Sequence, residues 1–220
     1  MLIATWNVNS IRTRLSQIID WINQVNPDIL CLQETKVMDE SFPIEPFKNI
    51  GYSVEIYGQK SYNGVAIISK EKASNVKKGF GSYANSDENI EVFQDQKRLI
   101  TADFNGIKII NVYVPNGSSL GSVKFEYKIN WLSCLASFLD EEEKKGNLIC
   151  LMGDFNVAPS SLDIHNPNKY EGGIMASEIE RNALNNVLKG RLIDSFRIFE
   201  KDTGHRSWWD YRNKAYELNK

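Results

Sequence analysis

The sequence predicts an α/β fold in which two layers of β-strands form a sandwich flanked by helices. Short apolar runs rich in β-branched residues outnumber the segments with helical spacing. A hairpin signal at Asn105-Gly106 occurs together with longer strand–helix–strand connections, so antiparallel and parallel pairing should both be present. Each predicted helix has a single apolar stripe, which is typical of a helix lying on the outside of a sheet.

Length and composition favour one soluble globular domain. The 220 residues are 42% hydrophobic and 25% charged, and no apolar run approaches the ~20 residues that a membrane-spanning helix needs. Residues 1–6 look like a first strand rather than a signal peptide, so we expect a cytoplasmic monomer with no membrane partner. The net charge of -2 gives no overall attraction for nucleic acid, and binding would need a local basic face. Cys31, Cys134 and Cys150 lie in apolar runs without metal-binding spacing, which predicts reduced core thiols.

The first half of the chain should contain four strands and one helix. Apolar residues recur at helical spacing from Ile11 to Val25, with Ser10 as N-cap and Pro27 after the end. A proline-containing loop in the region 41–58 should lead into the third strand, and the polar residues 70–91 should form an exposed excursion. The strands are expected at residues 2–6, 28–32, 52–57 and 65–69.

The second half should begin with a hairpin. Its strands are expected at residues 98–104 and 107–114, and a helix should follow, with an apolar stripe from Phe125 to Leu139 that fades into a solvated charged run at 140–145. Further elements are a fully buried strand at 148–152, a loop at 157–173 and a helix at 179–188 capped by Gly190.

A carboxylate follows the predicted strand at 148–152. Asp154 comes directly after Gly153, and Asn156 lies two residues further along. A carboxylate at the end of a core strand is costly unless it is paired or bound to a cation, which favours a functional site. The structural alternative is that Asp154 and Asn156 only close the strand as an Asx-turn.

Polar groups follow other predicted strands in the same way. Asn7, Glu34 and Tyr113 all lie at or near strand ends, although each of them alone would more often be a cap or a surface group. Two carboxylates with amides, and no clustered His or Cys, form an oxygen-rich set that suits Mg²⁺ or Mn²⁺. Such a site indicates phosphate chemistry, with a metal on the phosphodiester, a carboxylate that activates water, and a phenol and an amide that stabilise charge.

Two adjacent tryptophans near the end of the sequence are candidates for substrate contact. In a strand, Trp208 and Trp209 would face opposite sides, so one of them could be exposed as a platform for a sugar or a base. The alternative is that both are core aromatics. His165 and His205 have no partner visible in the sequence, and neither is predicted to be catalytic.

The motifs at these positions resemble the exonuclease III family of abasic-site (AP) endonucleases, within the endonuclease/exonuclease/phosphatase superfamily. They occur in the family's order and extend over almost the whole chain. The matching segments are residues 6–9 with Arg12, 32–36, 111–117, 153–159, 162–164, 194–197 and 207–212.

The resemblance implies a DNase I-like sandwich and a role for each site residue. Glu34 would bind Mg²⁺, which Mn²⁺ could replace, with Asn7 beside it. Tyr113 would contact the scissile phosphate and Asp154 would position or activate water. Asn156 would be a third catalytic residue, which helps to hold the phosphate. The substrate-binding residues would be Trp208 at the abasic sugar, Lys36 and Arg212. The implied reaction on double-stranded DNA is hydrolysis 5′ to an abasic site, with 3′-to-5′ exonuclease and 3′-phosphatase activity.

The sequence departs from the family pattern at its C-terminus. The family continues with a strand carrying Arg-Ile-Asp and ends in a Ser-Asp-His segment, and neither is found here. We therefore expect one domain, residues 1–220, that lacks its last strands. Two alternatives remain open: a catalytically inactive product that at most binds DNA or metal, and a superfamily phosphodiesterase that acts on lipid or inositol phosphates.

Overall fold

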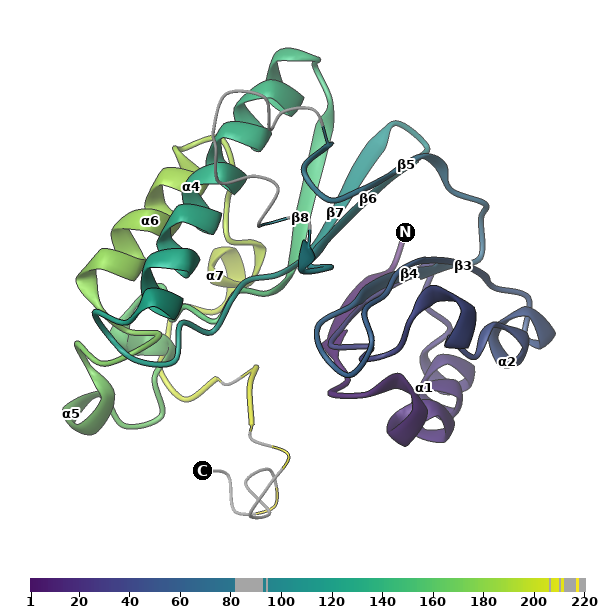
Figure 1. Ribbon diagram of the computed structural model, residues 1–220, viewed down its shortest axis with the longest axis horizontal. Helices are drawn as coiled ribbons and strands as arrows, with labels where there is room; N and C mark the ends of the chain where they lie inside the picture. Colours follow the sequence, from purple (N-terminus) through teal and green to yellow (C-terminus); the bar gives the residue numbers. More distant parts are fainter. Residues whose placement is uncertain (82–92, 94, 206, 210, 212–216, 218–220) are drawn as a thin grey trace. The chain divides into compact units, whose positions relative to one another are not determined.

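The computed structural model contains two compact units (Figure 1). The first consists of Met1–Val114 and Ser137–Phe155, and the second of Pro115–Ala136 and Asn156–Lys220. The predicted single domain stays a prediction. The structure describes residues 1–81, 93, 95–205, 207–209, 211 and 217.

The first unit begins with a mixed four-stranded sheet. Its strands follow the order β1-β2-β4-β3, and β1 and β2 run parallel because helix α1 (Ile11–Val25) connects them as a crossover. As predicted, Ser10 caps α1, with its side chain accepting a hydrogen bond from the Thr13 N–H. The strands are β1 (Ile3–Asn7), β2 (Ile29–Gln33), β3 (Ser53–Tyr57) and β4 (Val65–Ser69).

A second four-stranded sheet follows, in the order β5-β6-β7-β8. The predicted hairpin is confirmed, since β6 and β7 are antiparallel and their turn residues Asn105 and Gly106 have φ values of 50° and 82°, the left-handed conformation such a turn needs. Strands β7 and β8 are parallel, with Tyr113 opposite Asp154. The strands are β5 (Ser74–Lys78), β6 (Leu99–Phe104), β7 (Ile107–Tyr113) and β8 (Leu148–Asp154).

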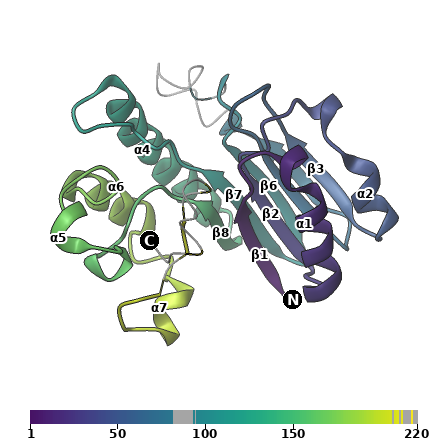
Figure 2. The same ribbon diagram turned by 90° about the horizontal axis from the view of Figure 1, so that it is seen from below.

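The two sheets of the first unit pack face to face. Ile29, Cys31 and Ile67 of the first sheet share a buried cluster with Ile100 and Ile109 of the second. The other face of the first sheet is covered by α1 and α2 (Ile44–Asn49), which lie on the same side of β3 and β4 (Figure 1), and the views agree (Figure 2). The predicted sandwich with helices outside is therefore confirmed for this unit.

A buried amide pair joins the two sheets. Gln33 of β2 is 1% exposed and Asn111 of β7 is fully buried. The Gln33 Nε2 donates to Asn111 Oδ1 (2.8 Å), and the Asn111 Nδ2 donates across the sandwich to the Leu32 and Ala66 carbonyl oxygens (3.0 and 2.9 Å). Because all these groups are removed from water, each bond would be costly to break.

The end of helix α4 (Val123–Lys144) packs within the first unit, and one residue of its charged run is buried. The run at 140–145 was predicted to be solvated, which holds for the exposed residues 143–145 but not for Glu142, which is 1% exposed. Its carboxylate lies 3.5 Å from Lys108 Nζ of β7 and 2.8 Å from Lys145 Nζ. The partner on β7 is 34 positions away in sequence, so the charge pattern of the helix alone could not reveal it.

The second unit contains the first part of α4 and several shorter helices. Helix α6 lies alongside α4 (Figure 1), and its predicted start is confirmed, with Ser177 and Glu180 forming a capping box. Its end has two left-handed residues, Lys189 and Gly190, where Gly190 alone was expected. The helices are α5 (Pro167–Tyr170), α6 (Glu178–Leu188) and α7 (Ser195–Phe199).

Several other sequence predictions need correction. The strand at 148–152 is not fully buried: β8 pairs only with β7 among the described residues, and Leu148 is 70% exposed. The loop at 41–58 contains α2, and the excursion at 70–91 contains the edge strand β5, while its residues 82–91 lie outside the described part. Cys31, Cys134 and Cys150 form no disulfide, as expected, but only Cys31 is fully buried, whereas Cys134 and Cys150 are partly exposed.

The structure contains no candidate membrane span: none of its described helices combines the length and the apolar character that crossing a bilayer requires.

Replacing Asn111 with alanine should destabilise the fold strongly. The change would leave the buried Leu32 and Ala66 carbonyls and the Gln33 amide without this partner, and we expect the free energy of unfolding to fall by about 3 kcal/mol. Urea denaturation would measure it, with the exposed Asn49→Ala as the matched control. Equal unfolding midpoints for the two variants would contradict the role of the amide pair.

Candidate active site

Two carboxylates of the first unit meet at the side chain of Asn7. The Asn7 Nδ2 donates to Glu34 Oε1 and to Asp154 Oδ2, both at 2.8 Å. Asn7 ends β1 and Glu34 directly follows β2, whereas Asp154 ends β8 of the other sheet. The sandwich therefore brings together three of the predicted site residues, all half-buried.

Left-handed backbone at the end of β2 places Glu34 in this position. Glu34 and Lys36 have φ values of 53° and 58°. The turn they form directs two carbonyl groups at the start of α1, where the Ser10 N–H donates to the Glu34 oxygen (2.7 Å) and the Ile11 N–H to the Thr35 oxygen (3.1 Å). Non-glycine residues in this region cost about 1 kcal/mol each, and such strain is found most often at functional sites.

Gly153 is required for the approach of β8 to β7 beside Asp154. Its φ is 141°, and a Cβ atom at this position would lie 1.9 Å from the Val112 carbonyl oxygen. Only glycine permits this contact, after which the Val114 N–H donates to the Asp154 carbonyl oxygen at 2.9 Å. The glycine that precedes the acid thus fixes where the acid lies.

Lys36 pairs with Glu34 at the same site. Its Nζ lies 2.8 Å from Glu34 Oε2 and also donates to Asn9 Oδ1. Burial by itself raises the pKa of Glu34, but the hydrogen bonds from Lys36, Asn7 and Tyr113 and the charge of Lys36 outweigh it, so the net pKa lies below the usual value. Glu34 is therefore ionised at neutral pH.

Tyr113 completes the group as a protonated phenol. Burial, and then the negative charge of Glu34, raise its pKa well above the usual range, and its hydroxyl donates to the Glu34 carboxylate. The Arg98 guanidinium stacks over the ring, 4.5 Å from its centroid, and its Nη1 donates to the Tyr113 carbonyl oxygen at 3.2 Å. The ring is thus held from both its edge and its face.

The remaining predicted residues belong to the second unit. Asn156 has a φ of 49°, and its Oδ1 accepts a hydrogen bond from Asn116 Nδ2 at 3.2 Å. Trp208 is 56% exposed while Trp209 is partly buried, although neither lies in a strand, so the role of Trp208 as a surface platform stays a prediction. Arg212 lies outside the described residues.

Sequence reasoning missed Asn9 and Arg98. Asn9 shares Lys36 with Glu34, and Arg98 orients Tyr113. Asparagine tolerates the left-handed conformation that Asn9 adopts, with a φ of 42°, but this was only a weak signal. The predicted hairpin register, with Phe104 opposite Ile107, already implies that Arg98 lies opposite Tyr113, and this signal in the sequence was missed.

The donor set fits a hard divalent cation. Glu34 and Asp154 supply carboxylate oxygens, and Mg²⁺ is commonly held by one or two carboxylates with water completing its shell. Within the described ranges, no three His, Cys, Asp or Glu side chains form a group that could hold a metal. Asn7 faces the carboxylates with its N–H groups while its Oδ1 accepts the Asn9 N–H at 3.0 Å, so its predicted role as a ligand stays a prediction.

The sequence is similar to proteins of a known family. The Endonuclease/Exonuclease/phosphatase family matches residues 4–219 of the chain. Exodeoxyribonuclease III of Haemophilus influenzae is 35% identical over 232 aligned residues, covering 100% of this chain and 84% of that protein.

Solved structures give the same result for the fold. A 3′ phosphatase from Neisseria bound to a product DNA hairpin is 36% identical, with a TM-score of 0.90 over 100% of this chain and 82% of that one. An AP endonuclease from Archaeoglobus fulgidus is 39% identical, with a TM-score of 0.88 over 99% of this chain and 82% of that one. The predicted DNase I-like architecture of mixed sheets with flanking helices is therefore confirmed.

The phenol of Tyr113 should stay protonated at a pH that ionises ordinary tyrosines. Its folded-state pKa is raised, so the stability this group contributes is complete below about pH 10 and is lost as the pH rises through the folded-state value. Alkaline titration by tyrosinate absorbance, compared with Tyr113→Phe, isolates this group among the nine tyrosines. A difference between the two proteins that titrates near pH 10 would contradict the arrangement.

Proposed function

Because the chain belongs to the endonuclease/exonuclease/phosphatase family, we infer that it is a hydrolytic phosphodiesterase, and we propose that it is a DNA-repair nuclease. Its activity would be Mg²⁺-dependent cleavage of double-stranded DNA 5′ to abasic sites, with 3′-to-5′ exonuclease activity. The observation that carries the proposal is the pair of carboxylates joined by Asn7 beside a protonated phenol.

Each residue of the site has a distinct role in this reaction. The ionised Glu34, together with Asp154, would hold Mg²⁺ or Mn²⁺, and the bound cation would neutralise charge on the phosphodiester. Asp154 would also orient water and accept its proton as the water oxygen attacks phosphorus and the bond to the 3′ oxygen breaks. Asn7 would keep the two carboxylates together, since it donates to both of them.

Tyr113 and Lys36 would act on the charge of the substrate. The Tyr113 hydroxyl is a donor that its raised pKa keeps protonated, so it can donate to a phosphate oxygen as charge grows there. Lys36, whose ammonium group is 2.8 Å from Glu34, supplies a positive charge close to the DNA backbone.

Residues of the second unit would bind the rest of the DNA. We assign Asn156 to a phosphate oxygen and the exposed Trp208 to the abasic sugar, with Arg212 as a further DNA contact. The relatives act on DNA by their names, as a 3′ phosphatase with a DNA hairpin and as an AP endonuclease. We also propose that the protein is a monomer in the cytoplasm.

Neutralising either carboxylate should slow cleavage strongly without unfolding the protein. Glu34→Gln and Asp154→Asn should each slow Mg²⁺-dependent incision of a duplex carrying one abasic analogue by about 100-fold or more. EDTA should stop the wild-type reaction, and Asp20→Asn, on the exposed face of α1, should leave the rate unchanged. Gel-based single-turnover kinetics measures all of these rates.

The same assay separates the alternatives. Hydrolysis of an inositol phosphate or sphingomyelin with no incision of the duplex would favour a phosphodiesterase for lipid or inositol phosphates. Folded wild-type protein that incises no duplex with Mg²⁺ or Mn²⁺ and hydrolyses neither of these substrates would favour the catalytically inactive product.

A further inference from the structure

A fully buried lysine in the second unit binds the loop that carries Asn156. Lys128 of α4 has a side chain that is 0% exposed. Its Nζ donates to the carbonyl oxygens of Asn156 (2.6 Å) and Asn116 (3.2 Å), and it forms an ion pair with Glu180. An ammonium group has three N–H donors, enough to reach all three of these acceptors.

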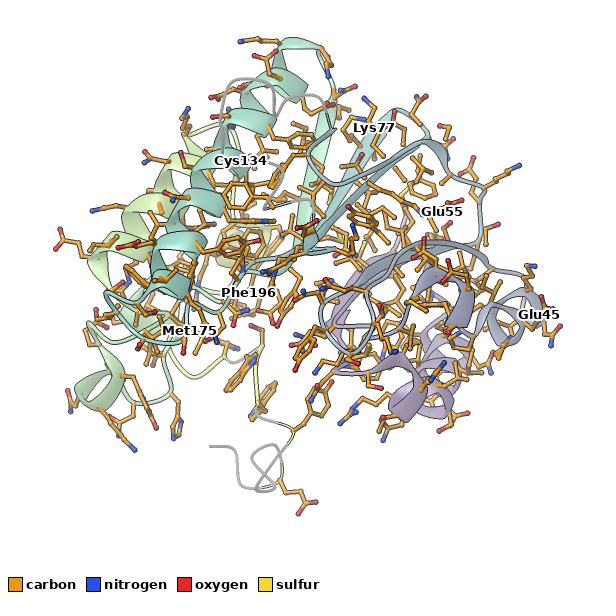
Figure 3. The ribbon with its side chains drawn as sticks, viewed as in Figure 1. Glu45, Glu55, Lys77, Cys134, Met175 and Phe196 are labelled. Carbon is orange, nitrogen blue, oxygen red and sulfur yellow. The ribbon has the colours of Figure 1, made fainter. Side chains whose placement is uncertain are left out.

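Glu180 is equally buried and fixes the other end of the pair. It is the third residue of α6, and besides Lys128 its Oε1 accepts the Met175 N–H at 3.0 Å. Its Oε2 accepts the N–H and the hydroxyl of Ser177, at 3.2 and 2.6 Å. Met175 is labelled in Figure 3, and its Sδ accepts a long hydrogen bond from Asn116 Nδ2 at 3.6 Å.

The two loops held by Lys128 present their side chains to each other. The Asn116 Nδ2 donates to Asn156 Oδ1 at 3.2 Å, which fixes the plane of the Asn156 amide. The aliphatic stem of Lys128 packs under Gly117, where a Cβ atom would lie 3.0 Å from Lys128 Cδ. Both the stem and the ammonium group of Lys128 therefore contact the loop at Asn116 and Gly117.

A buried ion pair is an inefficient source of stability. The desolvation of two charges cancels much of their attraction, and well-packed apolar side chains often do as well or better. Here two of the three donors of the cation go to the backbone of loops that carry asparagine side chains. Hydrogen bonds to backbone carbonyl groups fix the conformation of these loops, so the ion pair contributes to loop geometry.

We propose that Lys128 and Glu180 are positioning residues, which hold the Asn156 amide in the orientation that donates to a phosphate oxygen of the substrate. The inference rests on the proposed nuclease function and on the phosphate-binding role of Asn156. Since misplacement of a catalytic group by about 1 Å can cost about 100-fold in rate, loss of the cation should reduce catalysis through Asn156 rather than through the fold.

A double-mutant cycle tests this. Lys128→Met should lower kcat for incision by about 10-fold to 100-fold per folded molecule in the wild-type background, and by less than about twofold in an Asn156→Ala background. Lys128→Arg, which keeps the charge and the donors, should recover part of the loss. A purely structural role predicts no loss of kcat per folded molecule, and equal losses in both backgrounds would mean that Lys128 acts independently of Asn156. Either result would overturn the proposal.

The chain provides a matched control. Lys108 is also buried and ion-paired, with Asp103 (2.6 Å) and Glu142, but it lies near the opposite end of β7 from Tyr113, about 17 Å along the strand. Lys108→Met should lower the melting temperature while kcat per folded molecule stays at the wild-type value. A loss of kcat equal to that of Lys128→Met would overturn the proposal.

The experiment also covers a variant that does not fold and a wild-type protein that does not cleave DNA. If Lys128→Met does not fold, the variant with methionine at both Lys128 and Glu180 replaces it, because removing both charges leaves no unpaired buried ion. Wild-type incision is measured first: its absence would overturn the proposed function and this inference together. An active wild type with an additive cycle would overturn the positioning role alone.

Discussion

The buried hydrogen bond between Gln33 and Asn111 is the constraint on which the candidate active site depends. It joins β2 of one sheet to β7 of the other at 2.8 Å. Glu34 directly follows Gln33, and Tyr113 lies two residues after Asn111, on the same side of the strand. A sheet that slipped by one residue would turn these side chains away, so the amide pair sets the register that the site needs.

Strain and charge are concentrated where the chain would do its chemistry. The left-handed turn at Glu34 and Lys36, the required Gly153 and the pair of carboxylates all lie at the ends of strands that meet in the first unit. Packing of the rigid sandwich beneath them offsets these local costs. Lys36, whose Nζ lies 2.8 Å from Glu34 Oε2, neutralises part of the negative charge that the two carboxylates bring together.

Local sequence patterns predicted the helices and strands, whereas the buried ion pairs depend on contacts between residues that are distant in the sequence. The Asn105-Gly106 hairpin and the Ser10 cap were readable because a few adjacent residues determine them. The grouping of Asn7, Glu34, Tyr113 and Asp154 was predictable because several strands end in polar groups, while their catalytic roles stay predictions. The pairs Lys108–Glu142 and Lys128–Glu180 were not, since the partners of each pair lie far apart in the sequence, and helical charge patterns usually indicate a solvated face.

The proposed reaction requires Glu34 and Asp154 to act together as one site. Single-turnover incision rates of Glu34→Gln, Asp154→Asn and the double variant test this claim directly. Groups that act as a unit are strongly non-additive, so the double variant should be about as slow as the slower single variant. If the fold-losses in rate of the two single variants multiply in the double variant, the two carboxylates act independently, which would contradict a shared site.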